Sequence, residues 1–260
     1  MQNDKINLSL IIPIGLMLFS FFFGAGNLIF PPVLGQMAGE NISWGMLGFC
    51  LSGVGFPLLG VLAMAMKQSD NPDSIAMPMH PLYARAVTIL CALAIGPLFA
   101  IPRTAAVSFD TGIHSLLPAS CEAIGLPVYT VFFFVLTYFF SINPSKIIGH
   151  IGKFLSPMLL ICLAVLVICV FVNPTGSLKM PNPDFAVSPF FRGFQEGYNT
   201  MDLLAAILFG SITIKAIEAQ GITDKKVLTK LCSYAGLIAA FFLAIIYAAL
   251  AYTGALSINV

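Results

Sequence analysis

Seven apolar stretches alternate with short polar joints along the chain, at approximately 7–37, 43–66, 82–117, 127–142, 154–172, 190–216 and 229–254. A helix that crosses the hydrocarbon core of a bilayer needs about 20 mostly apolar residues, so each stretch predicts one membrane-spanning helix. The first, third and sixth stretches are longer than a single span requires. We therefore predict that these three helices are tilted or interrupted.

The first stretch is interrupted by flexible and polar residues near the expected middle of the bilayer. Its apolar residues run to Phe23 and resume at Leu28, with Gly24-Ala25-Gly26-Asn27 between them. Glycine lowers helix stability, and a backbone group freed in hydrocarbon costs several kcal/mol unless it is satisfied. Helices broken in this way near the midplane are typical of secondary transporters.

The sixth stretch carries a second interruption. The segment from Gly193 to Asp202 contains two glycines and a cluster of polar side chains, and a clean apolar helix follows from Leu203. Four unbroken stretches separate the two broken ones, which is the spacing expected of an inverted repeat of helices. We predict a single all-α transmembrane domain over residues 1–260, with 1–172 as a five-helix repeat and 173–260 as the start of a second, incomplete repeat.

Polar groups at the two breaks suit the binding of ions. The N-termini of half-helices present N–H groups to a carboxylate, and freed carbonyls with an amide or hydroxyl oxygen coordinate cations such as Na+. Asn27 and Thr200 fit the second task, and the backbone at 23–26 and 197–199 fits both. Close helix packing would explain the glycines of Gly193-x-x-x-Gly197. It does not explain the polar residues at the breaks, and we therefore favour a site: Asn27, Asn199, Thr200 and Asp202.

Composition makes a membrane protein the expected class. Hydrophobic residues make up 58% of the chain and charged residues 9%, whereas a soluble domain carries about 25% charged residues. The formal net charge of +1, without a basic tract, gives no indication of nucleic-acid binding. Six cysteines are scattered without ligand spacing, so we expect no disulfide framework, no cofactor and no metal site beyond a coupled cation.

The basic residues favour one orientation in the membrane. With a cytoplasmic N-terminus, nine lysines and arginines fall on the inner side and two on the outer side, Lys179 and Arg192. The inner group consists of Lys5, Lys67, Arg85, Lys146, Lys153, Lys215, Lys225, Lys226 and Lys230. The positive-inside rule therefore predicts a cytoplasmic N-terminus and, after seven spans, a periplasmic C-terminus of this chain. This orientation argues against a seven-helix receptor.

The residues at the breaks resemble a known family. Phe-Gly-Ala-Gly-Asn-Leu-Ile-Phe-Pro-Pro at 23–32 is similar to the first-helix signature of the bacterial branched-chain amino acid:cation symporters of the BrnQ type. Glu-Gly-Tyr-Asn-Thr-Met-Asp at 196–202 is similar to their sixth-helix motif, and the resemblance covers the whole chain. It implies a LeuT-like inverted-repeat transporter fold in the bacterial inner membrane, with Na+ as coupling ion and leucine, isoleucine and valine as substrates.

Carried over by position, the resemblance implies two sets of binding residues. The substrate set is Phe23, Gly24, Ala25, Gly26, Gly197, Tyr198 and Asn199. The cation set is Asn27, Thr200 and Asp202. Members of the family have more spans than the seven predicted here, so we expect a fragment or a truncated product. A transport-inactive remnant of such a carrier is therefore the alternative function.

Charged residues inside the spans add two candidates. Arg103 lies towards the outer half of the third stretch, and Asp110 follows seven positions later on the same helix face. They form either a gate or external vestibule that steers the substrate, or a static brace in which Arg103 pairs with Asp110 or Glu196. Asp202 binds a cation or a proton, caps the helix that begins near Met201, or does both.

Two other classes of function are weaker alternatives. An intramembrane enzyme is not expected, because the chain has no HExxH or GxSxG motif and no paired acids at catalytic spacing. A channel usually needs a symmetric assembly or a repeated filter loop. The expected partners are thus branched-chain amino acids, Na+ and the lipid bilayer, without nucleic acid.

Overall fold

The computed structural model describes residues 8–118, 122–142, 156–172, 176–222 and 224–257, which fold into helices with no strand among them. The α-helices are α1 (Leu8–Phe22), α2 (Ala25–Ala38), α3 (Ile42–Cys50), α4 (Phe56–Lys67), α5 (Pro81–Leu93), α6 (Ala100–Gly112), α7 (Glu122–Ser141), α9 (Ser156–Val172), α10 (Pro183–Val187), α11 (Pro189–Tyr198), α12 (Asp202–Glu218) and α13 (Lys225–Ala255). Short helical turns are η1 (Gly39–Asn41), η2 (Leu51–Gly55), η3 (Pro72–Ile75), η4 (Ala94–Leu98) and η5 (His114–Leu116). The all-α prediction is confirmed. Lys5, Cys121, Lys146 and Lys153 lie outside the described residues.

Four helical segments of the described chain are long and apolar enough to cross a membrane: Ala25–Lys67, Pro81–Gly112, Ile124–Ser141 and Lys225–Ala255. A fifth is added if α11 and α12, bent by 44° at their junction, form one span. This set differs from the seven predicted spans for three reasons. The first predicted span splits into α1 and α2, α2 continues into the second span without a gap, and the fifth begins at residues outside the described part. The architecture is that of a multi-pass membrane protein.

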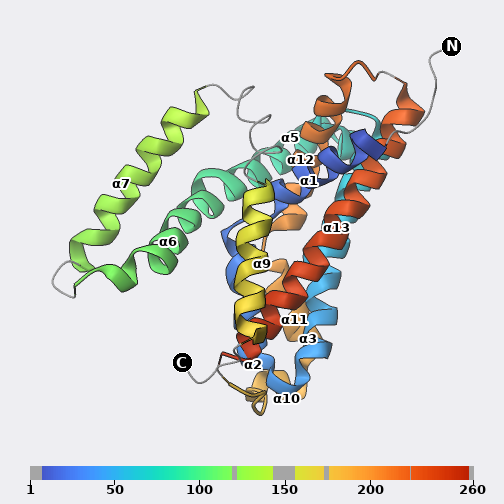
Figure 1. The fold of residues 1–260 in the computed structure, drawn as a ribbon. Helices are drawn as coiled ribbons and strands as arrows, with labels where there is room; N and C mark the ends of the chain where they lie inside the picture. Colours follow the sequence, from blue (N-terminus) through green and yellow to red (C-terminus); the bar gives the residue numbers. More distant parts are fainter. Residues whose placement is uncertain (1–7, 119–121, 143–155, 173–175, 223, 258–260) are drawn as a thin grey trace.

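The helical run from α2 to α4 folds back on itself. A Cβ atom built on Gly45 would lie 3.5 Å from Cδ2 of Leu34, although eleven residues of straight helix span about 16 Å. Gly39, at the start of the turn η1, has φ +48°, and glycine reaches this left-handed region without the steric cost that a Cβ imposes. α2 and α3 therefore lie side by side (Figure 1).

Helix α13 forms the centre of a bundle and packs against α1, α2 and α4, with α9 on its outer side. The side chains of Phe19, Phe49 and Tyr247 are completely buried in this core. Helix α12 packs along α4, and α11 packs along α3. The helices that flank the second break are thus held by different neighbours, whereas α1 and α2 both pack against α13.

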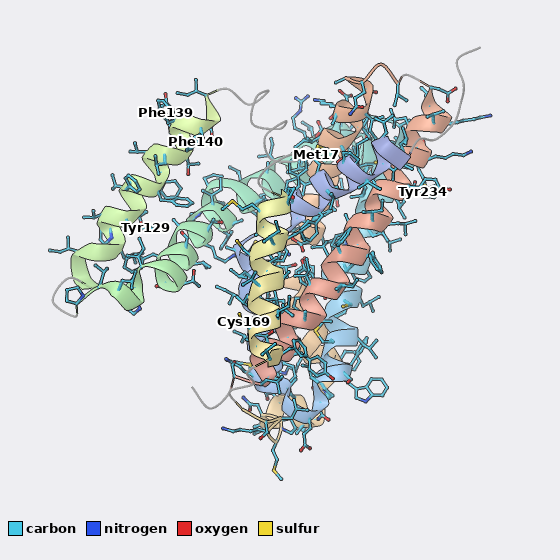
Figure 2. All side chains as sticks on the ribbon, viewed as in Figure 1. Met17, Tyr129, Phe139, Phe140, Cys169 and Tyr234 are labelled. Carbon is cyan, nitrogen blue, oxygen red and sulfur yellow. The ribbon has the colours of Figure 1, made fainter. Side chains whose placement is uncertain are left out.

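An arm formed by α5, α6 and α7 extends away from the bundle (Figure 1). Helix α7 packs against α6, and none of the residues in its apolar window is buried. Phe139 and Phe140 are exposed on α7 at the far side of the arm (Figure 2). An apolar helix with so little burial is suited to contact with lipid acyl chains.

Glycines bring α3 and α11 into very close contact. A Cβ built on Gly193 would overlap the carbonyl oxygen of Gly45, and one on Gly48 would overlap the carbonyl oxygen of Phe190. Small residues at such crossings allow backbones to approach where apolar burial alone supplies little driving force. The packing interpretation of Gly193 therefore describes a real contact, on the face of α11 that meets α3.

Candidate functional site

The two breaks meet inside the bundle. Asn27, in the first turn of α2, and Asp202, the first residue of α12, are 2% and 4% exposed. The Nδ2 atom of Asn27 donates a hydrogen bond to Oδ2 of Asp202 at 2.6 Å across 175 residues of sequence. Asn27 and Asp202, one from each break, thus form one buried contact.

The break between α1 and α2 is organised by the same asparagine. Gly24 precedes α2 in an extended conformation, with φ −115° and ψ −169°. Its N–H donates to Oδ1 of Asn27 at 3.0 Å, and this bond satisfies one of the amides that a helix N-terminus leaves without a partner. The Oδ1 atom of Asn27 therefore holds the backbone of the α1–α2 break, and its Nδ2 atom bonds to α12.

Tyr247 of α13 completes the buried cluster. Its hydroxyl donates to Oδ2 of Asp202 at 3.1 Å and accepts a hydrogen bond from Nδ2 of Asn27. The ring packs edge-on against Phe49, with centroids 5.2 Å apart. The sequence interpretation missed Tyr247; the available signal was a phenolic hydroxyl in the interior of a long apolar helix, where it requires a polar partner.

Thr200 and Met201 form the turn between α11 and α12. The Thr200 hydroxyl donates to the carbonyl oxygen of Gly197 at 2.8 Å and accepts from the N–H of Asp202 at 3.4 Å. Met201 has φ +67°, a left-handed conformation that costs a non-glycine residue about 1–2 kcal/mol. Strained backbone of this kind gathers at functional sites, because the surrounding structure has to enforce it.

Arg103 of α6 reaches the α11–α12 break from the arm. Its Nη1 donates to the carbonyl oxygen of Asn199 at 3.0 Å and its Nη2 to that of Thr200 at 3.4 Å. The predicted brace with Asp110 or Glu196 is therefore wrong. Asp110 is exposed two turns along α6, and Glu196 accepts from Nδ2 of Asn199 at 3.4 Å. Two carbonyls freed by the break offered nearer acceptors than either carboxylate.

The remaining predicted residues have mixed surroundings. Phe23, Gly26 and Gly197 are buried, whereas Gly24, Tyr198 and Asn199 are exposed and Ala25 is partly exposed. A Cβ on Gly197 would overlap Ser52 and Phe49 of the neighbouring segment, so this glycine also serves close packing. The predicted cation residues Asn27, Thr200 and Asp202 are thus brought together in the interior. Of the predicted substrate residues, Tyr198 is 47% exposed.

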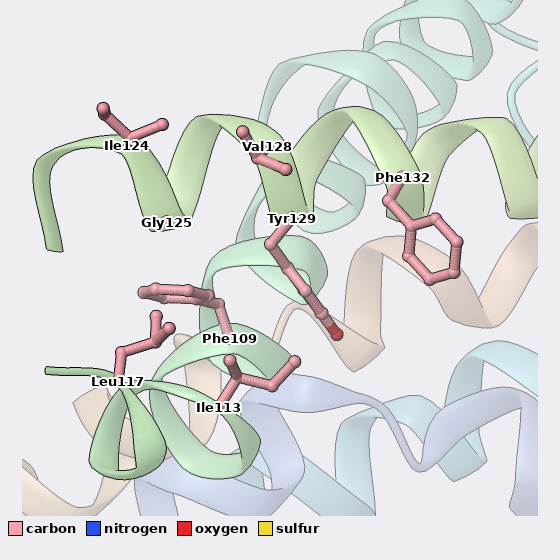
Figure 3. Close-up of a pocket in the computed structure, with 8 residues that line it drawn as sticks. All are labelled: Phe109, Ile113, Leu117, Ile124, Gly125, Val128, Tyr129 and Phe132. Atoms are coloured by element: carbon pink, nitrogen blue, oxygen red, sulfur yellow. The ribbon is translucent and has the colours of Figure 1, made fainter. Parts of the chain in front are cut away.

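A groove of about 440 Å³ lies elsewhere, between α6 and α7 (Figure 3). Its lining is apolar apart from Tyr129, whose hydroxyl donates to Oγ of Ser108 at 3.0 Å. Such a lining offers no charged partner to a zwitterionic ligand. No group of three or more His, Cys, Asp or Glu side chains that could hold a metal ion occurs within the described residues. The meeting point of the breaks is therefore the better candidate for a polar ligand.

Comparison with known proteins agrees with this picture. The model of a family described as "Branched-chain amino acid transport protein" matches residues 7–260. The chain belongs to this family. It is 45% identical to the branched-chain amino acid permease BrnQ of Bacillus subtilis, over 99% of this chain and 59% of that relative. It is 44% identical to the permease BraB of the same organism, over 95% and 56%.

A third relative is the branched-chain amino acid transport system 3 carrier protein of Pseudomonas aeruginosa, 38% identical over 94% of this chain and 55% of the relative. This member of the branched-chain amino acid transport protein family thus spans a little over half the length of these relatives. No solved structure matches it. The predicted family is confirmed, and this family and these relatives are named as transport proteins, permeases and carriers, and not as enzymes.

Proposed function

We propose that this chain carries the binding centre of a Na+-coupled symporter that moves leucine, isoleucine and valine into the cell across the bacterial inner membrane. The names of the relatives, branched-chain amino acid permeases and a carrier protein, support the substrate class. The observation that carries the proposal is the buried contact between Asn27 and Asp202, because it joins the two breaks at one point. The N-terminus is cytoplasmic in this proposal, as the basic residues predict.

The proposed fold is LeuT-like, with α1–α2 and α11–α12 as its two discontinuous helices. Two residues separate α1 from α2 and three separate α11 from α12, and Asn27 and Asp202 lie in the first turns of the helices that follow these breaks. In inverted-repeat transporters the corresponding helices of the two repeats are interrupted near the midplane and face each other. The contact between α2 and α12 through Asn27 and Asp202 is consistent with that arrangement.

The proposed cation site consists of Asn27, Thr200 and Asp202, with the hydroxyl of Tyr247 beside them. Among the described residues, the hydrogen-bond donors to the Asp202 carboxylate are two neutral side chains, Asn27 and Tyr247, and the Arg103 guanidinium attracts it without a hydrogen bond. A cation bound directly to this buried carboxylate would stabilise it further, and a small hard cation prefers carboxylate, amide and hydroxyl oxygens.

The proposed substrate site lies next to it, at the start of α2. The amides of Ala25 and Gly26 are in the first turn of this helix, where N–H groups and the positive end of the helix dipole attract a carboxylate. Phe22 and Phe23 are buried beside the break and supply apolar surface for a branched side chain. A pocket of this kind separates ligands that differ by one methylene by only about 1–3 kcal/mol, so the three substrates would share it.

Uptake of labelled leucine into proteoliposomes tests the proposal, with and without an inward Na+ gradient. Asn27→Ala is the site variant, and Asn71→Ala, which changes an exposed turn outside the breaks, is the matched control. Uptake that requires the gradient, survives Asn71→Ala and disappears with Asn27→Ala supports the proposal. Leucine uptake that is equal with and without the Na+ gradient refutes Na+ coupling. Leucine flux only down its own concentration gradient indicates a channel. No uptake from a folded chain favours the alternative, a transport-inactive remnant.

A further inference from the structure

Arg103 and Gly26 fit together in a way that neither position reveals by itself. A Cβ built on Gly26 would lie 2.6 Å from Nη2 of Arg103 and 3.2 Å from the ring of Phe30. The guanidinium of Arg103 lies over the Phe30 ring, with Cζ 5.3 Å from its centroid. Any residue larger than glycine at position 26 would therefore push the guanidinium away from α2.

The guanidinium occupies the carbonyl end of α11. The oxygens of Asn199 and Thr200 are acceptors at the negative end of that helix dipole, and in a membrane such groups need a donor. Arg103 supplies it from α6, so a side chain of the arm closes the break from outside the bundle. Within the described residues, Arg103 links the arm to the site by hydrogen bonds.

The Arg103 guanidinium does not use all of its hydrogen-bonding capacity at the break, as expected of a contact that can open. One of the two hydrogen bonds is long, at 3.4 Å. The Nε atom of Arg103 is buried without a partner within the described chain, although a guanidinium can donate five hydrogen bonds. Both acceptors are neutral carbonyls, and Asp202 attracts the guanidinium without a hydrogen bond to it; a bidentate pair with a carboxylate would be stronger.

We propose that Gly26 and Arg103 form a latch that closes the α11–α12 break, and that displacement of the guanidinium opens the break to water and to a ligand. Gly26 leaves room for the guanidinium, and the face of the Phe30 ring supports it by a cation–π contact. The carbonyl oxygens at the break accept its hydrogen bonds. Arg103 is thus a positioning residue. The proposal adds a conformational device to the proposed transport site, and only the nature of the ligand rests on that function.

The latch is tested with a thiol reporter at the break. Thr200→Cys places a thiol at a position that is 4% exposed, and a water-soluble maleimide is applied to the purified full chain. Mass spectrometry of the peptide that contains position 200 reports modification there alone, so the six native cysteines remain. The assay needs no transport, and a failure of the proposed function leaves its outcome interpretable.

Arg103→Gln and Gly26→Ala should each accelerate modification about tenfold, the population change that ~1.4 kcal/mol produces. Because both variants release the same guanidinium, the double variant should be no faster than the faster single one. Arg103→Lys should give a smaller increase. The matched controls are Gly112→Ala and Arg192→Gln. A Cβ on Gly112 would meet nothing within 4 Å, and the native Arg192 side chain pairs with Asp184 outside the break. Both controls should leave the rate unchanged.

An unchanged rate in Arg103→Gln overturns the latch, and so does a double variant whose acceleration is the product of the two single effects. Cys232, completely buried in α13, reports unfolding in the same samples. If Arg103→Gln also exposes Cys232, the milder Arg103→Lys decides. A faster reaction at position 200 with Cys232 protected supports the latch, and no difference from the parent chain overturns it.

Discussion

Replacement of Tyr247 by phenylalanine removes one hydroxyl from the buried cluster and leaves the ring in place. The contact of the ring with Phe49 remains, with its 5.2 Å centroid separation. Two hydrogen bonds are lost. The bond of 3.1 Å to Oδ2 of Asp202 ends on a carboxylate, and such bonds contribute about 1.5–3 kcal/mol. The bond that the hydroxyl accepts from Nδ2 of Asn27 joins neutral groups and contributes about 0.5–1.5 kcal/mol. Asn27 keeps its own bond to Asp202 at 2.6 Å, so the carboxylate is not left without a donor. We expect the free energy of unfolding to fall by about 2–4.5 kcal/mol.

Unfolding by sodium dodecyl sulfate in mixed micelles, followed by circular dichroism, measures this loss. Tyr252→Phe on the same helix is the matched control, because Tyr252 is 40% exposed and its change should stay within about 0.5 kcal/mol. Equal losses in the two variants would refute the assignment of Tyr247 to the cluster.

A double-mutant cycle with Asp202→Asn isolates the contribution of the charge. A hydrogen bond to a neutral amide contributes only about 0.5–1.5 kcal/mol, so Tyr247→Phe should cost less in the Asp202→Asn background than in the parent chain. An identical cost in both backgrounds contradicts the reasoning that the carboxylate strengthens this bond, because residues in direct contact should couple.

Two further changes test the packing and the helix ends. Gly193→Ala places a methyl group against the carbonyl oxygen of Gly45 and should lower the free energy of unfolding by about 1–3 kcal/mol. The control Gly112→Ala on α6 should leave this free energy unchanged. Equal losses for the two variants in micelle unfolding would contradict the close α3–α11 crossing. Asp224→Ala removes the carboxylate that accepts hydrogen bonds from the amides of Lys226 and Val227 and should lower the stability of the first turn of α13 by about 1 kcal/mol. Hydrogen exchange of the amides in this turn measures the loss. An unchanged exchange rate there would refute the capping role of Asp224.

The interruptions are predicted from local chemistry. Glycine and asparagine within an apolar run disfavour a continuous helix whatever surrounds them. In the structure α1 ends at Phe22 and α2 begins at Ala25, and α11 ends at Tyr198 and α12 begins at Asp202. The number of spans was harder to predict. The predicted joint between residues 37 and 43 contains the left-handed turn at Gly39, but the helical run continues through it from Ala25 to Lys67. Apolar length alone does not show where helices join, so the predicted span limits differ from the helices.

Partners could not be predicted, because they depend on how distant segments meet. The brace interpretation gave Arg103 a carboxylate partner, either Asp110 on the same helix or Glu196 in the sixth stretch. Its observed acceptors are 96 and 97 positions away and are backbone carbonyls, which every residue has and no pattern marks. Tyr247 is one of seven tyrosines; only the arrangement of α13 against both breaks distinguishes it from the exposed Tyr234 and Tyr252.

Packing and polar chemistry are divided between different residues of the same segment, and this division bears on why the polar residues are present. Gly193 and Gly197 meet α3 and η2, where a Cβ would collide with backbone. Asp202, by contrast, joins α2 and α13 through its carboxylate, and the Thr200 hydroxyl bonds within the turn that precedes it. If the segment served packing alone, apolar side chains at 200 and 202 would complete the core at lower desolvation cost. A buried carboxylate, a strained methionine and an arginine on free carbonyls are costly together, and a binding centre accounts for all three.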